Sequence, residues 1–396
     1  MIKGKTIVLG ITGGIAAYKA ADLSSKLTQA GANVKVVMTW EATELIKPIT
    51  FQALTGNPVV TEMFKPAEPS KITHISLADE ADIVAIVPAT ANIIAKIAAG
   101  IADDMLTCLV LATKAPIVIS PAMHHNMYVN PVTQENIDRL KSRGFIIIPA
   151  AHGRLASGAV GYGRLPEVTD IMGIIRQTLG RNGDLKGKHI VVTAGGTQEA
   201  IDPVRYIGNH SSGKMGYAIA EAARDRGAKV TLITTPTALN PVTGAEMVKV
   251  NSTQQMKDAV IKATTKADAL IMAAAVADYM PKTTAKQKIK KGEGGLTLEL
   301  VKTPDILTEI RGNFLKIGFA AETQDLIANA RKKLLSKDCD MFVANDVTLE
   351  GSGFGTDTNK VTLLLKDRKP EDLPLMSKRE VADKILDKVV KMMKKK

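Results

Sequence analysis

The sequence predicts an α/β protein made of two tandem Rossmann-like domains with parallel sheets. Short apolar runs rich in Val and Ile alternate with helical patterns along the 396 residues. Continuous apolar strands separated by helices are typical of a parallel sheet that is covered on both faces. The pattern starts again halfway along the chain, because residues 189–197 resemble residues 5–14. A polar, glycine-rich linker at residues 180–188 indicates the domain boundary,.

The first half contains a series of candidate strands. Each is an apolar run of strand length, and they span residues 5–11, 33–39, 81–89, 116–122 and 145–150,. Between the first two strands, residues 14–31 have the apolar spacing of a helix,. This alternation predicts helices on both faces of the first sheet.

The second half repeats this order. Its candidate strands at residues 189–194, 228–236 and 267–278 correspond to residues 5–11, 32–39 and 81–92 of the first half. Residues 280–300 break the pattern with a lysine-rich segment, for which we expect a loop. Residues 378–396 predict a basic helix. We therefore expect one domain over residues 1–185 and a second over residues 186–396.

Composition favours a cytoplasmic protein that acts on small anionic molecules. The two cysteines, Cys108 and Cys339, lie far apart and have no metal-binding spacing, which fits a reducing compartment,. No apolar run reaches the roughly 20 residues of a membrane span, so we expect no membrane association. The net charge of +12 comes from lysines spread along the chain, without a basic patch interleaved with aromatic residues. Phosphates and nucleotides explain this charge better than nucleic acid does.

The most informative segment of the second half is GGTQEAIDPVRYIGNHSSGKMG, residues 195–216. It lies between an apolar strand and an apolar helical pattern, where backbone N–H groups and a helix N-terminus can bind a phosphate. Its interior is rich in polar side chains, including Asn209 and Lys214. Core packing does not explain such a loop, so we expect a ligand site here.

The corresponding segment of the first half, GITGGIAAYK (residues 10–19), is a glycine-rich turn that contains Gly13, Gly14 and Ile15. It lacks the strict spacing of a dinucleotide site, and the second strand ends in Thr39 instead of an acidic residue,. A hydroxyl at this position suits a mononucleotide better than the ribose of NAD. A helix N-cap is an equally good interpretation of Thr39.

Several further motifs occur in a fixed order. They are PATAN (88–92), PAMHHNMY (121–128), RLASGAVGYGR (154–164), AAAVADYMP (273–281), KTPDI (302–306) and GFAAET (318–323). Together with NHSSGKMG (209–216), they resemble the bifunctional phosphopantothenoylcysteine decarboxylase and phosphopantothenate–cysteine ligase family of coenzyme A biosynthesis. The resemblance covers roughly residues 5–390. It implies a flavodoxin-like flavoprotein domain, an FMN-dependent decarboxylase, followed by a CTP-dependent ligase domain.

The resemblance assigns roles in the first domain. His74 matches the catalytic histidine of the family, and a histidine titrates near neutral pH, as a base beside a thiol requires. Residues matching the flavin site are Gly13, Gly14, Ile15, Thr39, Thr90, Asn92 and Thr107, and those matching the substrate site are Met123, His124 and Asn126. His124 stands where the family usually has an asparagine that binds the substrate carboxylate, so Asn126 is the alternative donor.

A second departure lies in the segment that resembles the family's substrate-covering flap. Ser157 stands where the family has a cysteine that donates a proton in the final reduction. A thiol has a pKa near 8.5, whereas a serine hydroxyl is a far weaker acid. Ser157 therefore predicts a slow final reduction, unless Tyr162 or water donates the proton instead. A third interpretation is a variant that has been trapped at this step on purpose.

The resemblance also assigns the ligase site. The matching catalytic residues are Asn209 and Lys288, and Lys288 also belongs to the nucleotide site. The other nucleotide-binding matches are Met272, Ala273, Ala274, Asp278, Thr303, Pro304, Asp305, Ile306, Phe319, Lys333 and Lys337. Lys333 and Lys337 are spaced to share one helix face. The implied cofactors are FMN and Mg²⁺, with CTP as co-substrate and no metal ligand assigned.

The family implies the substrates 4′-phosphopantothenate, L-cysteine and CTP, and a homo-oligomer. Trimeric flavin domains combined with dimeric ligase domains can close as a dodecamer. Three alternatives stay open. Ser157 and His124 favour a ligase with an impaired flavin domain, which would release little or no complete product. A NAD(P)-dependent dehydrogenase would bind nicotinamide, and a nucleic-acid-binding protein would bind DNA in a salt-dependent manner.

Overall fold

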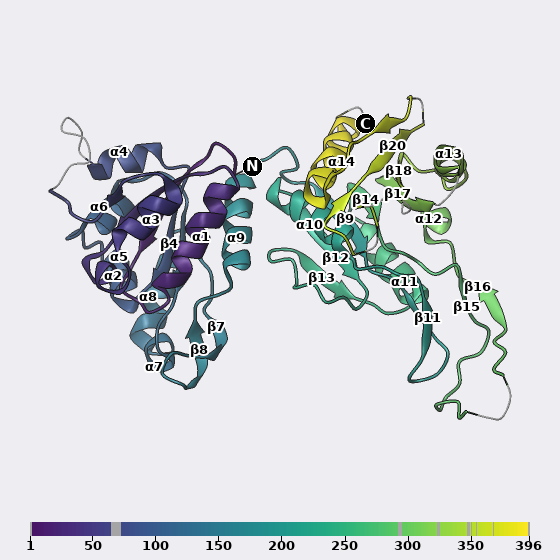
Figure 1. Cartoon of the computed structure of the whole chain (residues 1–396), viewed down its shortest axis with the longest axis horizontal. Helices are drawn as coiled ribbons and strands as arrows, with labels where there is room; N and C mark the ends of the chain where they lie inside the picture. The colour runs from purple at the N-terminus through teal and green to yellow at the C-terminus, as the bar shows by residue number, and fades with distance from the viewer. Residues whose placement is uncertain are drawn as a thin grey trace. The chain divides into compact units, whose positions relative to one another are not determined.

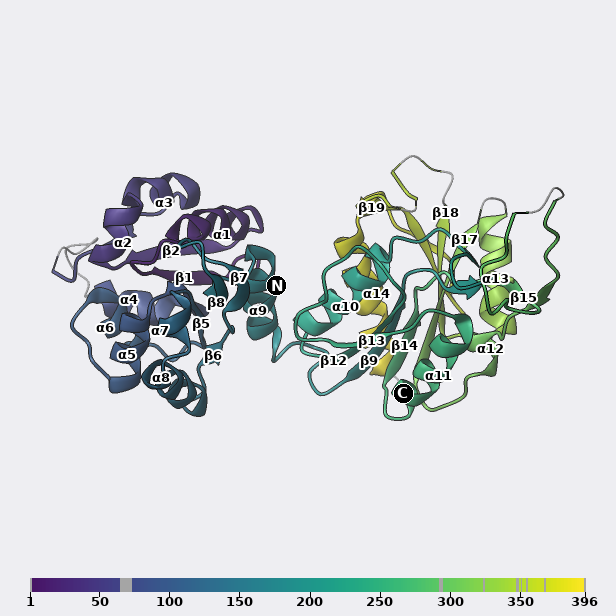
Figure 2. The same cartoon turned by 90° about the horizontal axis from the view of Figure 1, so that it is seen from below.

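The computed structural model divides the chain into two compact units, residues 1–180 and 181–396. It describes residues 2–64, 73–291, 295–322, 325–346, 349, 351–353, 355–366 and 368–394. Each unit is a central sheet with helices on both faces (Figures 1 and 2). None of the described helices combines the length and the apolar character that crossing a bilayer requires.

The sheet of the first unit is entirely parallel, as the sequence predicts. Its strand order is β3-β2-β1-β4-β5-β6. The strands are β1 (Thr6–Ile11), β2 (Asn33–Met38), β3 (Val59–Val60), β4 (Ile83–Ala89), β5 (Ile117–Pro121) and β6 (Ile146–Ile147). Every residue of β4 is buried, which is why its sequence is a continuous apolar run. The expected strand at residues 145–150 shortens to β6.

The helices of the first unit bury two separate cores. They are α1 (Ala17–Gln29), α2 (Trp40–Leu45), α3 (Pro48–Thr55), α4 (Thr73–Glu80), α5 (Ala91–Ala99), α6 (Met105–Ala112), α7 (His125–Tyr128), α8 (Pro131–Ser142) and α9 (Val168–Gly180). One core contains Leu23, Phe51 and Ile171, from α1, α3 and α9. The other contains residues of α4, α5, α6 and α8. A hairpin, β7 (Ala151–Arg154) and β8 (Val160–Arg164), precedes α9.

The second unit also contains the expected parallel sheet, which runs from β13 to β18, and two strands with antiparallel pairing, β20 and β21, extend it at one edge. The strand order is β13-β12-β9-β14-β17-β18-β20-β21. The strands are β9 (His189–Ala194), β12 (Lys229–Thr234), β13 (Glu246–Lys249), β14 (Ala269–Met272), β17 (Leu315–Glu322), β18 (Met341–Asp346), β20 (Val361–Leu365) and β21 (Glu371–Asp372). β20 is antiparallel to both of its neighbours. No crossover helix is assigned between β18 and β20 among the described residues, and a connection without such a helix suits antiparallel strands.

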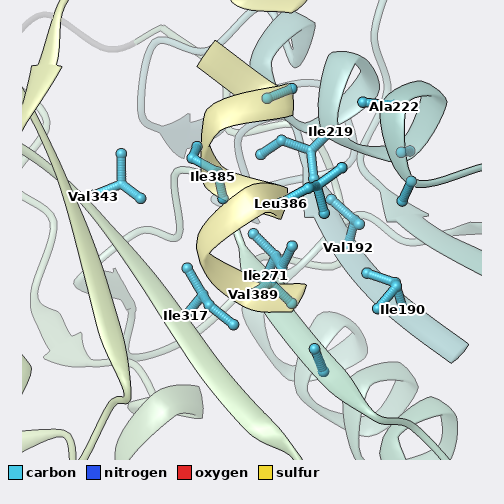
Figure 3. Close-up of a cluster of buried hydrophobic side chains, with 14 of the residues drawn as sticks. Ile190, Val192, Ile219, Ala222, Ile271, Ile317, Val343, Ile385, Leu386 and Val389 are labelled. Atoms are coloured by element: carbon cyan, nitrogen blue, oxygen red, sulfur yellow. The ribbon is translucent and has the colours of Figure 1, made fainter. Parts of the chain in front are cut away.

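The C-terminal basic helix, α14 (Lys378–Met393), is confirmed. It packs beside α10 (Lys214–Asp225) on one face of the sheet, with Ile219, Leu386 and Val389 among the buried side chains (Figure 3). A second core on the opposite face contains residues of α11 (Thr253–Thr264), α12 (Ile306–Glu309) and α13 (Leu326–Ser336).

Three small ribbons complete the second unit. They pair β10 (Gln198–Ala200) with β11 (Tyr206–Gly208), β15 (Tyr279–Pro281) with β16 (Leu300–Lys302), and β19 (Thr358–Asn359) with β22 (Met376–Ser377). The lysine-rich segment expected to be a loop at residues 280–300 thus begins and ends in a paired strand. Its residues 292–294 lie outside the described residues.

Leu386→Ala tests how strongly α14 stabilises the second unit. Leu386 is fully buried, so we expect a loss of about 2–5 kcal/mol in the free energy of unfolding of this unit. Urea unfolding followed by far-UV circular dichroism should show its transition at lower urea. The only tryptophan, Trp40, lies in the first unit, so its fluorescence transition should stay in place. The exposed Lys384→Ala on the same helix is the control, and an equal effect of both variants would contradict this packing role.

Candidate active sites

The predicted flavin residues follow neighbouring strands of the first sheet. Gly13, Thr39, Thr90 and Met123 come after β1, β2, β4 and β5 respectively. These strands are adjacent in the order β2-β1-β4-β5. Because the carboxyl ends of parallel strands meet at one edge, these residues gather where open α/β sheets bind ligands.

Contacts at this edge bring the glycine-rich turn against the PATAN motif. The Thr12 hydroxyl donates to the Pro88 carbonyl oxygen at 2.8 Å, and the Thr90 amide donates to the Thr12 hydroxyl at 3.0 Å. A Cβ atom added to Gly14 would lie 3.6–3.8 Å from atoms of Pro88, Thr90 and Ala122. A Cβ atom on Gly13 would lie 2.4 Å from the Glu41 Cβ atom, so this close approach requires glycine.

Two buried hydroxyls at this edge have no hydrogen-bond partner among the described residues. They belong to Thr39, at the end of β2, and Ser120, in β5. Thr39 occupies the N-cap position of α2 but makes no cap hydrogen bond, which argues against the N-cap interpretation. A buried hydroxyl without a partner is costly, so both side chains fit a site completed by a polar ligand. The sequence did not single out Ser120, because a serine in an apolar strand has no distinguishing pattern.

The structure changes the interpretation of other predicted flavin residues. The N-cap of α5 is Thr90, whose hydroxyl accepts a hydrogen bond from the Ile93 amide. Asn92 is therefore not the N-cap of this helix, and its side chain is exposed. Thr107 is buried, and its hydroxyl takes part in a capping box with Asp104. Ile15 is exposed.

The predicted substrate residues are joined to the β7–β8 hairpin. The Met123 amide donates to the Gly163 carbonyl oxygen at 2.9 Å, and the Tyr162 amide donates to His125 Nδ1 at 3.2 Å. His124 caps α7 by accepting a hydrogen bond from the Asn126 amide. Ser157 is exposed in the turn of this hairpin. The PAMHHNMY segment therefore anchors the element that carries Ser157.

Two further predicted groups lie beside these elements. The ring of Tyr162 meets the ring of His152 edge-on, with centroids 5.0 Å apart. His74 is half-buried in the first turn of α4, directly after the undescribed residues 65–72. Among the described residues, no hydrogen bond or ion pair joins His74 to another predicted site residue, so its role stays a prediction.

The second unit contains a cavity of about 940 Å³. It lies at the carboxyl edge of its sheet, where β9 and β14 meet the N-terminus of α10. Most of the predicted ligase residues line it, namely Asn209, Met272, Ala273, Ala274, Asp278, Thr303, Pro304, Asp305, Ile306, Phe319, Lys333 and Lys337. Asn209 is held in place by its side-chain amide, which donates to the Val276 carbonyl oxygen at 3.0 Å.

Charged groups organise the side of the cavity formed by α12 and α13. Lys337 pairs with Asp305 at 3.3 Å. Burial raises the pKa of the Asp305 carboxyl, but hydrogen bonds from Thr308 and the charge of Lys337 outweigh it, so the net pKa is lowered. Beneath this pair, the buried Lys316 ammonium donates to the Lys337 carbonyl oxygen at 3.0 Å and to that of Leu307 at 3.3 Å. Lys316 thus joins the two segments that carry Asp305 and Lys337.

Lys288 is not among the residues that line the cavity, and its side chain is exposed. Its neighbour Ile289 is held through both backbone groups. The Ile289 amide donates to Asp202 Oδ2 at 3.2 Å, and Arg205 donates to the Ile289 carbonyl oxygen at 2.9 Å. The Arg205 guanidinium and backbone amides hold the pKa of the buried Asp202 carboxyl far below its usual range. We call these contacts of Asp202 and Arg205 with Ile289 the latch, and the sequence did not predict it.

The carboxylates that line the described cavity are Asp278 and Asp305. Within the described part of the chain, no group of three or more His, Cys, Asp or Glu side chains could hold a metal ion. The cavity lining also includes Lys214, Asn345, Asn359 and Lys378, which the sequence did not assign to the nucleotide. Lys378 is the first residue of a helix rich in surface lysines, so the sequence pattern does not predict that it is buried.

Two families match the chain. The flavoprotein family matches residues 1–180, and the DNA/pantothenate metabolism flavoprotein C-terminal domain matches residues 185–393. The coenzyme A biosynthesis bifunctional protein CoaBC of Bacillus subtilis is 48% identical over 400 residues, covering 100% of this chain and 98% of the relative. That of Vibrio parahaemolyticus is 47% identical over 398 residues, covering 99% of each chain.

Two solved structures are similar to parts of the chain. The C-terminal domain of a coenzyme A biosynthesis bifunctional protein CoaBC is 44% identical, covers 54% of this chain and 100% of that chain, and has a TM-score of 0.47. The FMN-dependent cysteine decarboxylase SpaF is 34% identical, covers 41% of this chain and 91% of that chain, and has a TM-score of 0.38.

Asp202→Asn tests the latch on Ile289. The substitution removes the charge that Arg205 and the Ile289 amide bind, and hydrogen bonds to a charged group contribute about 1.5–3 kcal/mol. We expect amide hydrogen exchange in residues 285–291 to accelerate about tenfold or more. Hydrogen–deuterium exchange with mass spectrometry measures this. The exposed Asp258→Asn is the control, and unchanged exchange in Asp202→Asn would show that Ile289 is held by other contacts.

Proposed function

We propose that this chain, which belongs to the family of coenzyme A biosynthesis bifunctional proteins CoaBC, carries out two consecutive reactions. It is a bifunctional enzyme with a flavoprotein decarboxylase part and a ligase part. Residues 186–396 would join 4′-phosphopantothenate to L-cysteine with CTP, and residues 1–185 would decarboxylate the product with FMN. The observation that carries the ligase assignment is the cavity that gathers Asn209 with the predicted nucleotide residues.

The ligase reaction needs an activated carboxylate. The carboxylate oxygen of 4′-phosphopantothenate attacks the α-phosphorus of CTP, and pyrophosphate leaves. The cysteine nitrogen then attacks the acyl carbon, loses a proton, and CMP leaves. Lys333 and Lys337 would stabilise the phosphates, and Asn209 would donate to the oxyanion that develops. Phe319 would contact the base. Mg²⁺ bound mainly by phosphates, with few carboxylates such as Asp278, fits this lining.

The decarboxylase assignment draws on the edge of the first sheet. The unpartnered hydroxyls of Thr39 and Ser120 and the partly exposed turn at Gly14 fit a flavin mononucleotide. The bound flavin supplies two-electron oxidation and reduction at the cysteine-derived end of the substrate. In this scheme, Asn126 binds the substrate carboxylate, and His74 takes a proton from the thiol. The hairpin that carries Ser157 covers the substrate.

The alternative to complete turnover is a flavin unit impaired in the final reduction, in which Ser157 or Tyr162 must supply the proton that a thiol would supply. For the assembly, we propose trimers of the flavin domain joined through dimers of the ligase domain into a dodecamer. The mass of the particle in solution tests that proposal.

The two activities can be tested together. Purified protein mixed with 4′-phosphopantothenate, L-cysteine, Mg²⁺ and CTP should yield 4′-phosphopantetheine, detected by mass spectrometry. Ser157→Cys should accelerate the final reduction at least about tenfold, because general acid catalysis typically contributes about 10²–10⁴. Ser157→Ala is the control that removes the hydroxyl alone. Equal turnover of the native chain and Ser157→Cys would rule out a slow final reduction, and no coupling with CTP would refute the ligase assignment.

Thr39→Val tests the flavin site. If flavin completes the hydrogen bonding of Thr39, the loss of this bond should weaken FMN binding about fivefold to a hundredfold. The Thr39 hydroxyl has no partner within the described protein, so flavin-free Thr39→Val should be as stable as the native chain or more so. Quenching of flavin fluorescence measures the affinity. Thr28→Val in α1, whose hydroxyl bonds to its own helix, is the control. Unchanged affinity would remove Thr39 from the site.

A further inference from the structure

The ligase cavity receives lysines from both faces of the sheet. Lys333 and Lys337 are on or next to α13, which packs on the face that carries α11 and α12. Lys214 and Lys378 begin α10 and α14, which pack together on the opposite face (Figure 2). All four lysines line the same cavity. The reaction proposed above needs two separate anionic groups in this cavity, the triphosphate of CTP and the phosphate monoester of 4′-phosphopantothenate.

Lys378 is a buried cation at the second face. Its side chain is only 7% exposed, and its ammonium donates to the carbonyl oxygens of Thr356 and Thr358 at 2.5 and 3.0 Å. No carboxylate of the described chain forms an ion pair with it. Burial lowers the pKa of Lys378, the nearby charge of Lys214 lowers it further, and the charge of Asp357 opposes this shift. A buried positive charge without an ion-pair partner favours a nearby anion.

Lys214 lies beside Lys378 and has a replaceable partner. Its ammonium donates to the Gly355 carbonyl oxygen and to Asp357 Oδ1, both at 2.7 Å. The Asp357 side chain is 89% exposed, so this ion pair contributes little to stability. A phosphate monoester offers more acceptor oxygens and more charge than one carboxylate. It can therefore take the place of Asp357 on Lys214 at small cost.

Hydrogen bonds connect the described residues around the two lysines. Ser352 is fully buried, and its hydroxyl contacts the side-chain oxygens of Asn345 and Asn359 at 3.0 and 2.9 Å. Lys378 holds the carbonyl groups of Thr356 and Thr358, as described above. The start of α10 adds backbone N–H groups that no helical carbonyl accepts, and these favour an anion. The lysines therefore belong to a hydrogen-bonded wall of the cavity.

We propose that Lys214 and Lys378 form a second anion subsite that binds the phosphate monoester of 4′-phosphopantothenate. The proposal rests on the ligase function above and assigns a site for its second anionic substrate. The phosphate replaces Asp357 as the partner of Lys214. Lys378 contributes its positive charge and holds the backbone carbonyl groups of Thr356 and Thr358. Placing the monoester on the α10 side and the triphosphate on the α13 side keeps two like charges apart. The carboxylate at the other end of the substrate is then directed toward the α-phosphorus.

Steady-state pyrophosphate release by the full chain tests the subsite. Lys214→Met should raise KM for 4′-phosphopantothenate about tenfold to a hundredfold, the effect of losing one charge-assisted contact. Its KM for CTP should change less than about twofold. Lys333→Met is the matched control, and it should raise KM for CTP instead. A rise in the CTP KM of Lys214→Met, or no rise for 4′-phosphopantothenate, would overturn the subsite.

Asp357, the ion-pair partner of Lys214, provides a second test, because its substitution should change KM in the opposite direction. Asp357→Asn removes the carboxylate that competes with the phosphate, so it should lower KM for 4′-phosphopantothenate. If the Lys214–Asp357 pair served only to hold the loop, both Lys214→Met and Asp357→Asn would raise KM for 4′-phosphopantothenate. A raised KM in Asp357→Asn would therefore contradict the exchange of Asp357 for phosphate.

Measurements of direct binding test the subsite independently of the ligase reaction. In calorimetric titrations without nucleotide, the native chain should bind 4′-phosphopantothenate at least about tenfold more tightly than pantothenate. Lys214→Met should lose most of this difference. If the native chain shows the difference but releases no pyrophosphate, the proposed function fails and the anion subsite is supported. If it couples the substrates but binds both compounds equally, the subsite alone is overturned.

Discussion

Burial of both faces of a parallel sheet constrains everything else in this chain. Each unit covers its central strands with helices on both sides, so β1 and β9 leave almost no exposed surface. Polar ligands then meet the sheet only where its strands end and its helices begin. In both units, several of the polar side chains that the sequence singles out, such as Thr39 and Asn209, lie at that carboxyl edge. The fold therefore decides where chemistry can occur before any catalytic residue is specified.

The carboxyl edge of each sheet carries different polar groups in the two units. In the first, close packing around Gly13 and Gly14 leaves the buried hydroxyls of Thr39 and Ser120 as the unsatisfied groups. In the second, Gly216 lets α10 start against β9, since a Cβ atom there would lie 2.6 Å from that of Ala194. Lysines line the cavity beside it. The two edges therefore offer different groups to a ligand, neutral hydroxyls in the first unit and lysines in the second.

The strands and the predicted nucleotide residues can be recognised in the sequence for different reasons. β4 is predictable because a strand buried on both faces is a continuous apolar run,. β20 and β21 are not, since their direction depends on a connection without a crossover helix,. Residues such as Phe319 and Lys337 were found through motifs in family order. Lys378 was missed because a lysine at the start of an amphipathic helix looks solvent-exposed, and its burial comes only from the packing of residues 355–359.

The segment that joins β10 to α10 links the two groups expected to act on the acyl substrate. It carries Asp202 and Arg205, which hold Ile289, and a few residues later Asn209, which lines the cavity. Two hydrogen bonds thus tie the backbone next to Lys288 to the segment that carries Asn209. The Asn209 amide in turn donates to the Val276 carbonyl oxygen, which belongs to the cavity lining. The backbone beside Lys288 and the cavity wall at Asn209 are therefore parts of one hydrogen-bonded segment.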